Sequence, residues 1–311
     1  MNKVVVILGP TATGKSACAI ELARRLDGEI ISGDSMLVYK NMNIGTAKPT
    51  AEELALIPHH LVDILPPDAQ FSVVDFKQKA EELISDINAR GKLPIIAGGT
   101  GLYIKALLEN YSFNEVDEDK VLRQKLEKEA AELGAEKLYA RLVALDPEAA
   151  KLIHPNNVRR VVRALESALK GGHVSQESTY NKVDDQPTLA YDAKVFGLTM
   201  ERDFLYERIN KRVDIMLDMG LEQEVRDLLA QGVPTTCQSM QSIGYRQMVW
   251  YLKQGMPYAE AVDKLKQATR NFAKRQLTWY RKMPYINWYE VERSLNYDEI
   301  INAMYNELTS K

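Results

Sequence analysis

Short runs of β-branched and other apolar residues alternate along most of the chain with segments of helical periodicity. The runs are too short for helices and are typical of buried strands. Their regular alternation with helices predicts an α/β fold with a parallel sheet, in which the last run forms an edge strand. The strands are expected at residues 4–8, 29–32, 60–64, 93–97, 193–199 and 286–291, and the main helices at 17–26, 73–90, 102–108, 202–219, 222–231, 245–254, 258–282 and 297–308.

The pattern changes between residues 116 and 189. Leucines there follow helical spacing, charges are dense, and no run typical of a strand interrupts them. We therefore predict an all-helical insertion domain at 116–189, within a core domain formed by residues 1–115 and 190–311. The polar stretch 171–187 is expected to be a flexible return to the core.

Composition places the chain among ordinary globular proteins. Of its 311 residues, 45% are hydrophobic and 27% charged, and the net charge is −3. This balance excludes a generally basic nucleic-acid coat but allows a local basic surface. Cys18 and Cys237 cannot build a disulfide framework or a metal site. With no signal peptide and no apolar run near the ~18 residues of a membrane helix, we expect a cytoplasmic protein away from membranes.

The stretch between residues 9 and 16 has the spacing G-x4-G-K-S, between a predicted strand and a predicted helix. This is the context of a phosphate-binding P-loop, whose backbone N–H groups and helix N-terminus attract anions. Lys15 is expected to reach the terminal phosphates, and the Ser16 hydroxyl to bind Mg²⁺. By itself the motif favours nucleotide binding, including ATP; the alternative is a glycine-rich turn that binds nothing. The phosphate-binding residues are Gly9, Pro10, Thr11, Ala12, Thr13, Gly14, Lys15 and Ser16.

Two further candidates follow predicted strands. Asp34 comes after the second strand and Thr100 after the fourth, so both should share one cleft with the P-loop at the carboxyl ends of the strands. Asp34 could coordinate Mg²⁺ or accept a proton from a nucleophile. The alternative is a turn-forming aspartate, because Asp bonds readily to its own backbone. For Thr100 the alternative is a plain strand-to-helix turn.

Arginines and lysines gather on three predicted helices. Arg208 and Arg212 are four residues apart, so their guanidinium groups could together bind a diphosphate. Basic residues interleaved with aromatics along residues 264–282, and three more in the insertion, suit an RNA backbone with exposed bases. The alternative for each cluster is a solvated helix face. The insertion cluster consists of Arg159, Arg160 and Arg163.

Several parts of ordinary nucleotide hydrolases are missing from the sequence. No apolar strand ends in Asp-Glu, and no Asn-Lys-x-Asp stretch selects guanine. From pattern alone, a P-loop small-molecule or nucleoside kinase is the best interpretation.

Seven segments in a fixed order indicate a different use of the P-loop. The segments are GPTATGKS at 9–16, DSMLVY at 34–39, NIGTAKP at 43–49, GGTGLY at 98–103, RALE at 163–166, GYRQ at 244–247 and AKRQLTW at 273–279. The series extends over nearly the whole chain and resembles the bacterial tRNA dimethylallyltransferases, also called tRNA isopentenyltransferases.

The resemblance implies transfer of a dimethylallyl group from dimethylallyl diphosphate to the N6 amine of the adenosine 3′ of the anticodon in tRNA, with release of diphosphate. The P-loop would then bind the diphosphate leaving group rather than ATP, together with Mg²⁺. Because the adenine must leave its stack, the insertion and the core are expected to clamp the anticodon stem-loop. A monomeric enzyme is expected.

The resemblance also assigns roles to individual residues. The catalytic set is Asp34, which would orient the amine and take its proton, with Thr11, Lys15 and Arg212. The diphosphate-binding set is the P-loop with Arg208 and Arg212, of which Arg212 is favoured; Thr11, Ala12 and Thr13 would act mainly through backbone N–H groups. The tRNA-binding set is Asp34, Ser35, Met36, Leu37, Thr100, Arg123, Arg159, Arg160, Arg163, Gln241, Ser242, Gly244, Tyr245 and Arg246.

Overall fold

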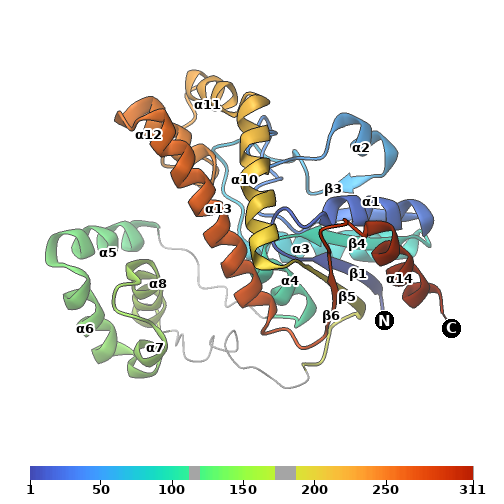
Figure 1. The fold of residues 1–311 in the computed structure, drawn as a ribbon. Coiled ribbons are helices and arrows are strands. Elements are labelled where there is room, and N and C mark those ends of the chain that lie inside the picture. The colour runs from blue at the N-terminus through green and yellow to red at the C-terminus, as the bar shows by residue number, and fades with distance from the viewer. Residues whose placement is uncertain (112–119, 172–186, 311) are drawn as a thin grey trace. The chain divides into compact units, whose positions relative to one another are not determined.

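The computed structural model describes residues 1–111, 120–171 and 187–310. One six-stranded sheet, in the order β3-β2-β4-β1-β5-β6, contains only parallel neighbours, which confirms the predicted α/β fold (Figure 1). β6 lies at an edge of this sheet, as its sequence predicts. The strands are β1 (Lys3–Leu8), β2 (Gly28–Ser32), β3 (His59–His60), β4 (Leu93–Gly98), β5 (Asp192–Thr199) and β6 (Ile286–Glu290).

Side chains of β1 alternate between the two faces of the sheet, and each face carries its own apolar core. Val4, Val6 and Leu8 join the core that includes α3 (Val73–Ala89) and α4 (Gly101–Leu108). Val5 and Ile7 join the opposite core, which includes α1 (Lys15–Arg25) and α14 (Tyr297–Thr309). Because both faces are buried, the strand is continuously apolar rather than alternating in sequence.

Four helices of the core domain lie between β5 and β6. α10 (Arg202–Asp218) lies beside α13 (Tyr258–Tyr280), and α11 (Leu221–Ala230) and α12 (Tyr245–Gln254) connect them (Figure 1). α10 ends before Gly220, whose φ of 98° is the left-handed conformation expected of a residue that closes a helix. These boundaries agree closely with the sequence prediction.

Two local predictions for the stretch between β2 and α3 have different outcomes. Ser72 and Asp75 form the predicted capping box at the start of α3, each side chain bonding the other's backbone N–H. A strand at residues 60–64 is wrong, because β3 ends at His60. Leu61 and Asp63 have φ values of 60° and 56°, and these left-handed conformations turn the chain away from an extended path. The short helix α2 (Ala51–Leu56) precedes β3.

The chain divides into two compact units, Met1–Asn110 with Asp185–Lys311, and Tyr111–Asp184. The described part of the second unit is helical and has a core of its own, which includes Leu126, Leu142 and Leu165. The predicted return at 171–187 lies almost wholly outside the described residues. The helices of the second unit are α5 (Lys120–Leu133), α6 (Ala135–Leu145), α7 (Pro147–Leu152) and α8 (Val158–Leu169).

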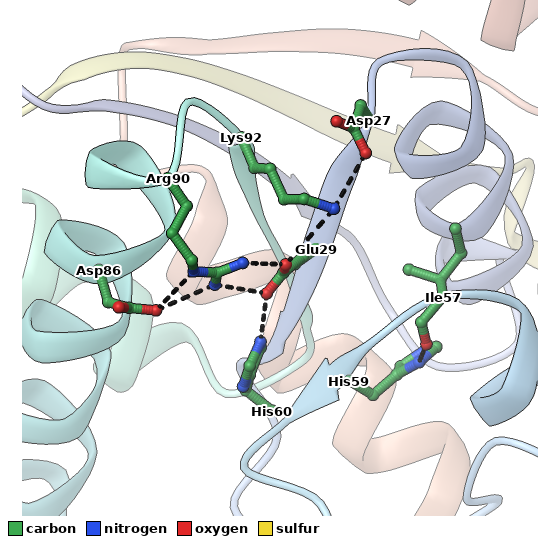
Figure 2. A network of polar contacts seen from close by, with 8 residues as sticks. All are labelled: Asp27, Glu29, Ile57, His59, His60, Asp86, Arg90 and Lys92. Carbon is green, nitrogen blue, oxygen red and sulfur yellow. Dashed lines mark hydrogen bonds and ion pairs between the residues drawn. The ribbon is translucent and has the colours of Figure 1, made fainter.

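A buried carboxylate lies at the amino end of β2. Glu29 is 4% exposed and receives two hydrogen bonds from Arg90, of 2.5 and 2.8 Å (Figure 2). Nε2 of His60 lies 2.8 Å from the same carboxylate, and Nζ of Lys92 lies 3.7 Å away. This cluster is at the opposite end of the strand from Asp34, so it stabilises the sheet rather than forming part of the site described below.

None of the helices in the described ranges is long and apolar enough to cross a bilayer.

Candidate active site

Three loops leave the carboxyl ends of three adjacent strands. Leu8 of β1 pairs with Gly98 of β4, and Ala97 of β4 pairs with Ser32 of β2. The P-loop, the loop at 98–101 and the segment beginning at Asp34 are therefore neighbours, and hydrogen bonds join the last two. The Ser35 N–H donates to the Thr100 hydroxyl and the Thr100 N–H to the Gly33 carbonyl, both at 3.1 Å.

The P-loop has a compact internal geometry. Ala12 and Gly14 have φ values of 67° and 89°, and α1 begins immediately after Gly14. The Thr13 hydroxyl and the Lys15 ammonium group each donate a 2.8 Å hydrogen bond to the Pro10 carbonyl. Gly14 is required for a second reason, since a Cβ there would lie 2.5 Å from the ring of Tyr297 on α14.

Lys15, Asp34 and Arg212 form one group of interacting charges. Burial, and then the charge of Arg212, lower the pKa of Lys15 to about 7, while Asp34 opposes the shift. Burial raises the pKa of Asp34, opposed by a 2.8 Å hydrogen bond from the Met36 N–H and by the two cations. Burial lowers the pKa of Arg212, and Asp34 opposes that shift too. An anion binding here would meet two poorly hydrated cations beside a carboxyl group.

Both arginines predicted for the diphosphate lie at the P-loop. Nε of Arg208 donates a 3.0 Å hydrogen bond to the carbonyl of Ala12. Arg212, one turn further along α10, is the arginine whose charge acts on both Lys15 and Asp34. The structure therefore gives the two side chains different surroundings: Arg208 supports the loop backbone, and Arg212 faces the charged group.

One expectation for the P-loop requires correction. The backbone N–H of Thr11 donates a 2.9 Å hydrogen bond to Oε1 of Gln276, so it is not free to bind a phosphate oxygen. Thr13 is completely buried, with its hydroxyl turned inward. Ser16, the predicted Mg²⁺ ligand, is exposed at the second position of α1.

Hydrogen bonds from Lys48 and to Glu224 hold the backbone of the segment that follows Asp34. Nζ of Lys48 donates a 2.7 Å hydrogen bond to the Tyr39 carbonyl and pairs with Asp63. The carboxylate of Glu224 on α11 accepts hydrogen bonds from three successive backbone N–H groups, those of Asn43, Ile44 and Gly45, at 2.8, 2.9 and 3.2 Å. Ser35, Met36 and Leu37, which come before these contacts in the chain, remain partly exposed.

The segment 241–246 needs a second correction. Gly244 and Tyr245 are buried, and the Tyr245 hydroxyl donates to Glu224 at 2.5 Å. The Tyr245 side chain has no surface to offer to RNA, and we assign it a structural role instead. Gln241 is exposed, Ser242 is half-buried, and the guanidinium of Arg246 lies 5.3 Å from the ring centroid of Trp250.

Three of the four arginines predicted in the helical unit are exposed. Arg159, Arg160 and Arg163 project from α8, whose opposite face is buried in the unit's core. Arg123 differs, because its side chain is 18% exposed and it bonds the buried carboxylate of Glu166 at 3.0 and 2.8 Å. Arg123 therefore does not lie on a solvated helix face.

The basic stretch of α13 divides into two parts. In its first half, Lys266 pairs with Asp214 at 2.6 Å and Arg270 bonds Asn210 at 2.6 Å, so these residues join α13 to α10. In its second half, Lys274 and Arg275 are exposed. These exposed side chains lie next to Gln276, which contacts the P-loop.

Sequence reasoning missed several supporting residues that have close contacts with these loops. Gln276 and Glu224 carry no local signal of their own, although Gln276 falls within the AKRQLTW segment. Tyr297 donates a 3.1 Å hydrogen bond to the Thr13 carbonyl across 284 positions of sequence. Among the described residues, these supports include Lys48, Glu224, Gln276, Tyr280 and Tyr297.

A P-loop beside a carboxyl group, at the carboxyl edge of a parallel sheet, defines an α/β P-loop enzyme that acts on a phosphorylated substrate. The family described as IPP transferase matches residues 37–283. The chain belongs to this family and has tRNA dimethylallyltransferase activity.

Individual relatives agree over the full length. The tRNA dimethylallyltransferase of Oceanobacillus iheyensis is 48% identical over 305 residues, covering 98% of this chain and 96% of that protein. The tRNA isopentenylpyrophosphate transferase structure from Staphylococcus epidermidis is 47% identical, covers 100% of both chains and has a TM-score of 0.74. A eukaryotic dimethylallyltransferase solved while acting on tRNA is 28% identical, covers 100% of this chain and 80% of its own, and has a TM-score of 0.82.

Proposed function

We propose that the P-loop binds the diphosphate of dimethylallyl diphosphate as the leaving group, and that Asp34 accepts the proton from the adenosine N6 amine. The observation that carries this proposal is the single charge group of Lys15, Arg212 and Asp34. It supplies cations for a departing diphosphate and, beside them, a base for the incoming amine.

The diphosphate site uses the P-loop, but not every N–H group of it. Since the Thr11 N–H is bonded to Gln276, the donors are the later N–H groups of the loop, at Ala12 to Ser16, with Lys15 and Arg212. As the bond between the allylic carbon and the diphosphate oxygen breaks, negative charge grows on the leaving oxygen. Donors already oriented toward that oxygen stabilise the transition state more than the ground state.

Asp34 acts on the nucleophile. The lone pair of the adenine N6 atom is delocalised into the ring, so attack on the allylic carbon requires an oriented amine that loses its proton as the C–N bond forms. Burial raises the pKa of Asp34, which makes its carboxylate a stronger base than an exposed aspartate. The hydrogen bond from the Met36 N–H to Oδ1 fixes the orientation of the carboxyl group toward the incoming amine.

Mg²⁺ fits this donor set. The described residues contain no group of three His, Cys, Asp or Glu side chains that could form a metal cage. Mg²⁺ commonly takes only one or two protein oxygens and completes its shell with substrate phosphates and water. The exposed hydroxyl of Ser16 would be the protein ligand, and the ion would neutralise charge on the diphosphate.

The tRNA would contact both units. In the core domain the proposed contacts are the segment 34–37, Thr100 and the exposed part of 241–246; in the helical domain at 116–189 they are the exposed arginines of α8 and, less directly, Arg123. Phosphate contacts from arginines position an RNA, whereas contacts to base edges select its sequence. A monomeric, cytoplasmic enzyme is part of the proposal.

A labelling experiment tests the assignment of the P-loop. The enzyme is incubated with unmodified tRNA, Mg²⁺ and dimethylallyl diphosphate labelled in the allyl group, and parallel reactions contain Lys15→Ala or labelled ATP. We expect label in the tRNA with the wild type, strong loss with Lys15→Ala, and no transfer of the γ-phosphate of ATP. Consumption of ATP with a small acceptor would support the kinase alternative for this P-loop.

A further inference from the structure

A buried amide connects the proposed diphosphate loop to the loop that contains Thr100. Gln276 lies on α13 and is 4% exposed. Its Oε1 accepts the 2.9 Å hydrogen bond from the Thr11 N–H, and its Nε2 donates a 2.9 Å hydrogen bond to the Gly99 carbonyl. The two ends of one side chain thus bond two loops that follow neighbouring strands.

A second side chain of the same helix reinforces this connection. Tyr280, one turn after Gln276, is completely buried. Its hydroxyl lies 2.8 Å from the Gly99 carbonyl and 3.4 Å from the Gly9 carbonyl, so it too reaches both loops. Residues four apart on a helix lie on the same face, and α13 therefore presents two adjacent bridges to the site.

The bridge is close to the proposed base. A Cβ on Gly99 would lie 2.4 Å from Nε2 of Gln276 and 3.9 Å from Oδ2 of Asp34. The absence of a side chain at Gly99 lets the amide and the carboxyl group approach one another across the loop. From Gly99 the connection continues through Thr100, whose hydroxyl accepts the Ser35 N–H.

We propose that Gln276 is a positioning residue that sets the separation between the diphosphate loop and the carboxyl group of Asp34. The inference rests on the proposed function, in which these two loops hold the leaving group and the base. A nucleophilic displacement needs the attacking and leaving atoms at a defined distance and angle, and a misplacement of about 1 Å costs on the order of 10²-fold in rate.

An uncharged amide suits this position for a physical reason. It accepts one hydrogen bond and donates another at the same time, without adding charge beside Lys15 and the diphosphate. An ionised carboxylate of the same size could accept the Thr11 N–H but would face the Gly99 carbonyl without a proton to donate. A protonated carboxyl group could make both hydrogen bonds again.

Two substitutions use this difference, and a third is a matched control. Gln276→Met keeps the volume and removes both hydrogen bonds, whereas Gln276→Glu keeps both only when protonated. Gln267→Met makes the same chemical change at an exposed position of α13. Single-turnover transfer to an anticodon stem-loop is measured with saturating donor, together with stem-loop affinity and thermal stability.

We expect Gln276→Met to lower the transfer rate by about 10- to 100-fold, with stem-loop affinity close to the wild type. Gln267→Met should retain the wild-type rate. The rate of Gln276→Glu, divided by that of the wild type at the same pH, should rise as pH falls from about 8 to about 6, because burial favours the protonated acid. Thermal stability is measured at the same pH values, because a role in folding alone would make the rate follow the folded fraction, whereas a positioning role changes the rate of fully folded enzyme.

Three results would overturn the inference: a wild-type rate in Gln276→Met, a loss confined to stem-loop affinity, or a pH-independent ratio for Gln276→Glu. The last comparison, made at pH values where Gln276→Glu is fully folded, decides the matter even if Gln276→Met folds poorly. Failure of the diphosphate assignment has a separate readout. In that case Lys15→Ala would bind Mg²⁺-pyrophosphate as tightly as the wild type in calorimetry, whatever the behaviour of the Gln276 variants.

Discussion

The hydroxyl of Tyr245 donates a 2.5 Å hydrogen bond to Oε1 of Glu224 on α11. The same carboxylate accepts the N–H groups of Asn43, Ile44 and Gly45. One half-buried acid of α11 therefore fixes a loop of the core domain and a tyrosine at the start of α12. This explains why two segments distant in sequence keep one arrangement.

Glu224→Gln is expected to loosen that loop. Hydrogen bonds to a charged acceptor are stronger than neutral ones, and replacing the carboxylate with an amide should lower the free energy of unfolding by about 2 kcal/mol. Hydrogen exchange of the amides of residues 43–45 should accelerate. Glu222→Gln is the control, because Glu222 makes an exposed i,i+4 pair with Arg226. Equal protection of the three amides in both variants would contradict the role of Glu224.

The lowered pKa of Lys15 predicts a pH dependence of diphosphate binding. With a pKa of about 7, Lys15 is increasingly neutral above pH 7, and a bound diphosphate should restore its proton. Affinity for Mg²⁺-pyrophosphate should therefore fall as pH rises through about 7 to 8.5, and binding should take up a proton. Calorimetry in buffers of different ionisation enthalpy measures that uptake.

Lys15→Arg is the comparison for this effect, because arginine stays charged throughout the range. Titration of pyrophosphate itself is common to both proteins, so the difference between them isolates Lys15. Identical proton uptake in the two proteins would show that Lys15 does not titrate at the diphosphate.

The cluster around Glu29 predicts how stability depends on pH. Hydrogen bonds from Arg90, acting against burial and helped by His60, lower the pKa of Glu29 to about 2. The pKa of Glu29 is near 4.5 in the unfolded chain and lower in the folded one. The ionised carboxylate therefore contributes its full stabilisation above about pH 4.5, and this contribution is lost as pH falls toward 2. Glu29→Gln should lower the free energy of unfolding by roughly 3 kcal/mol near neutral pH, with the difference shrinking below about pH 4.5.

Denaturant unfolding at several pH values checks this, with exposed Glu82→Gln as the control. A difference between Glu29→Gln and the wild type that stays constant from neutral to acidic pH would refute the ion-pair account.

The exposed arginines of α8 predict a salt dependence of tRNA binding. Each phosphate contact contributes about 0.7 to the slope of log affinity against log salt concentration for a single-stranded region. The double variant Arg159→Ala, Arg160→Ala should bind an anticodon stem-loop more weakly and with a shallower slope. Lys151→Ala is a control in the same unit, because Lys151 pairs with Glu148. An unchanged slope in the double variant would show that Arg159 and Arg160 do not contact RNA phosphates.

Most of the fold could be predicted from periodicity, but the supports of the site could not. β-branched runs in β1 and β4 predict strands that are buried on both faces. Asp34 follows β2 and Thr100 follows β4, and because these strands are parallel to β1, both residues lie at the same edge of the sheet as the P-loop. The contact between Thr11 and Gln276 joins residues 265 positions apart, and no local pattern encodes such a contact.

The incorrect predictions have a similar origin. Apolar residues at 61 and 64 fit a strand pattern, but left-handed conformations at Leu61 and Asp63 end it. The GYRQ segment contains RNA-compatible side chains, yet its tyrosine is buried because Glu224, 21 positions earlier, provides a partner for the hydroxyl. Burial depends on the tertiary partner, which the local sequence does not specify.

The central claim is that the P-loop stabilises the departing diphosphate, while the adjacent carboxylate of Asp34 accepts the proton from the amine. Its most direct test is the single-turnover transfer of a labelled dimethylallyl group to an anticodon stem-loop by Asp34→Asn. We predict a rate reduced by about 10²- to 10⁴-fold, the range of general base catalysis, with unchanged affinity for the stem-loop and for Mg²⁺-pyrophosphate. A rate within a few-fold of the wild type would contradict the account.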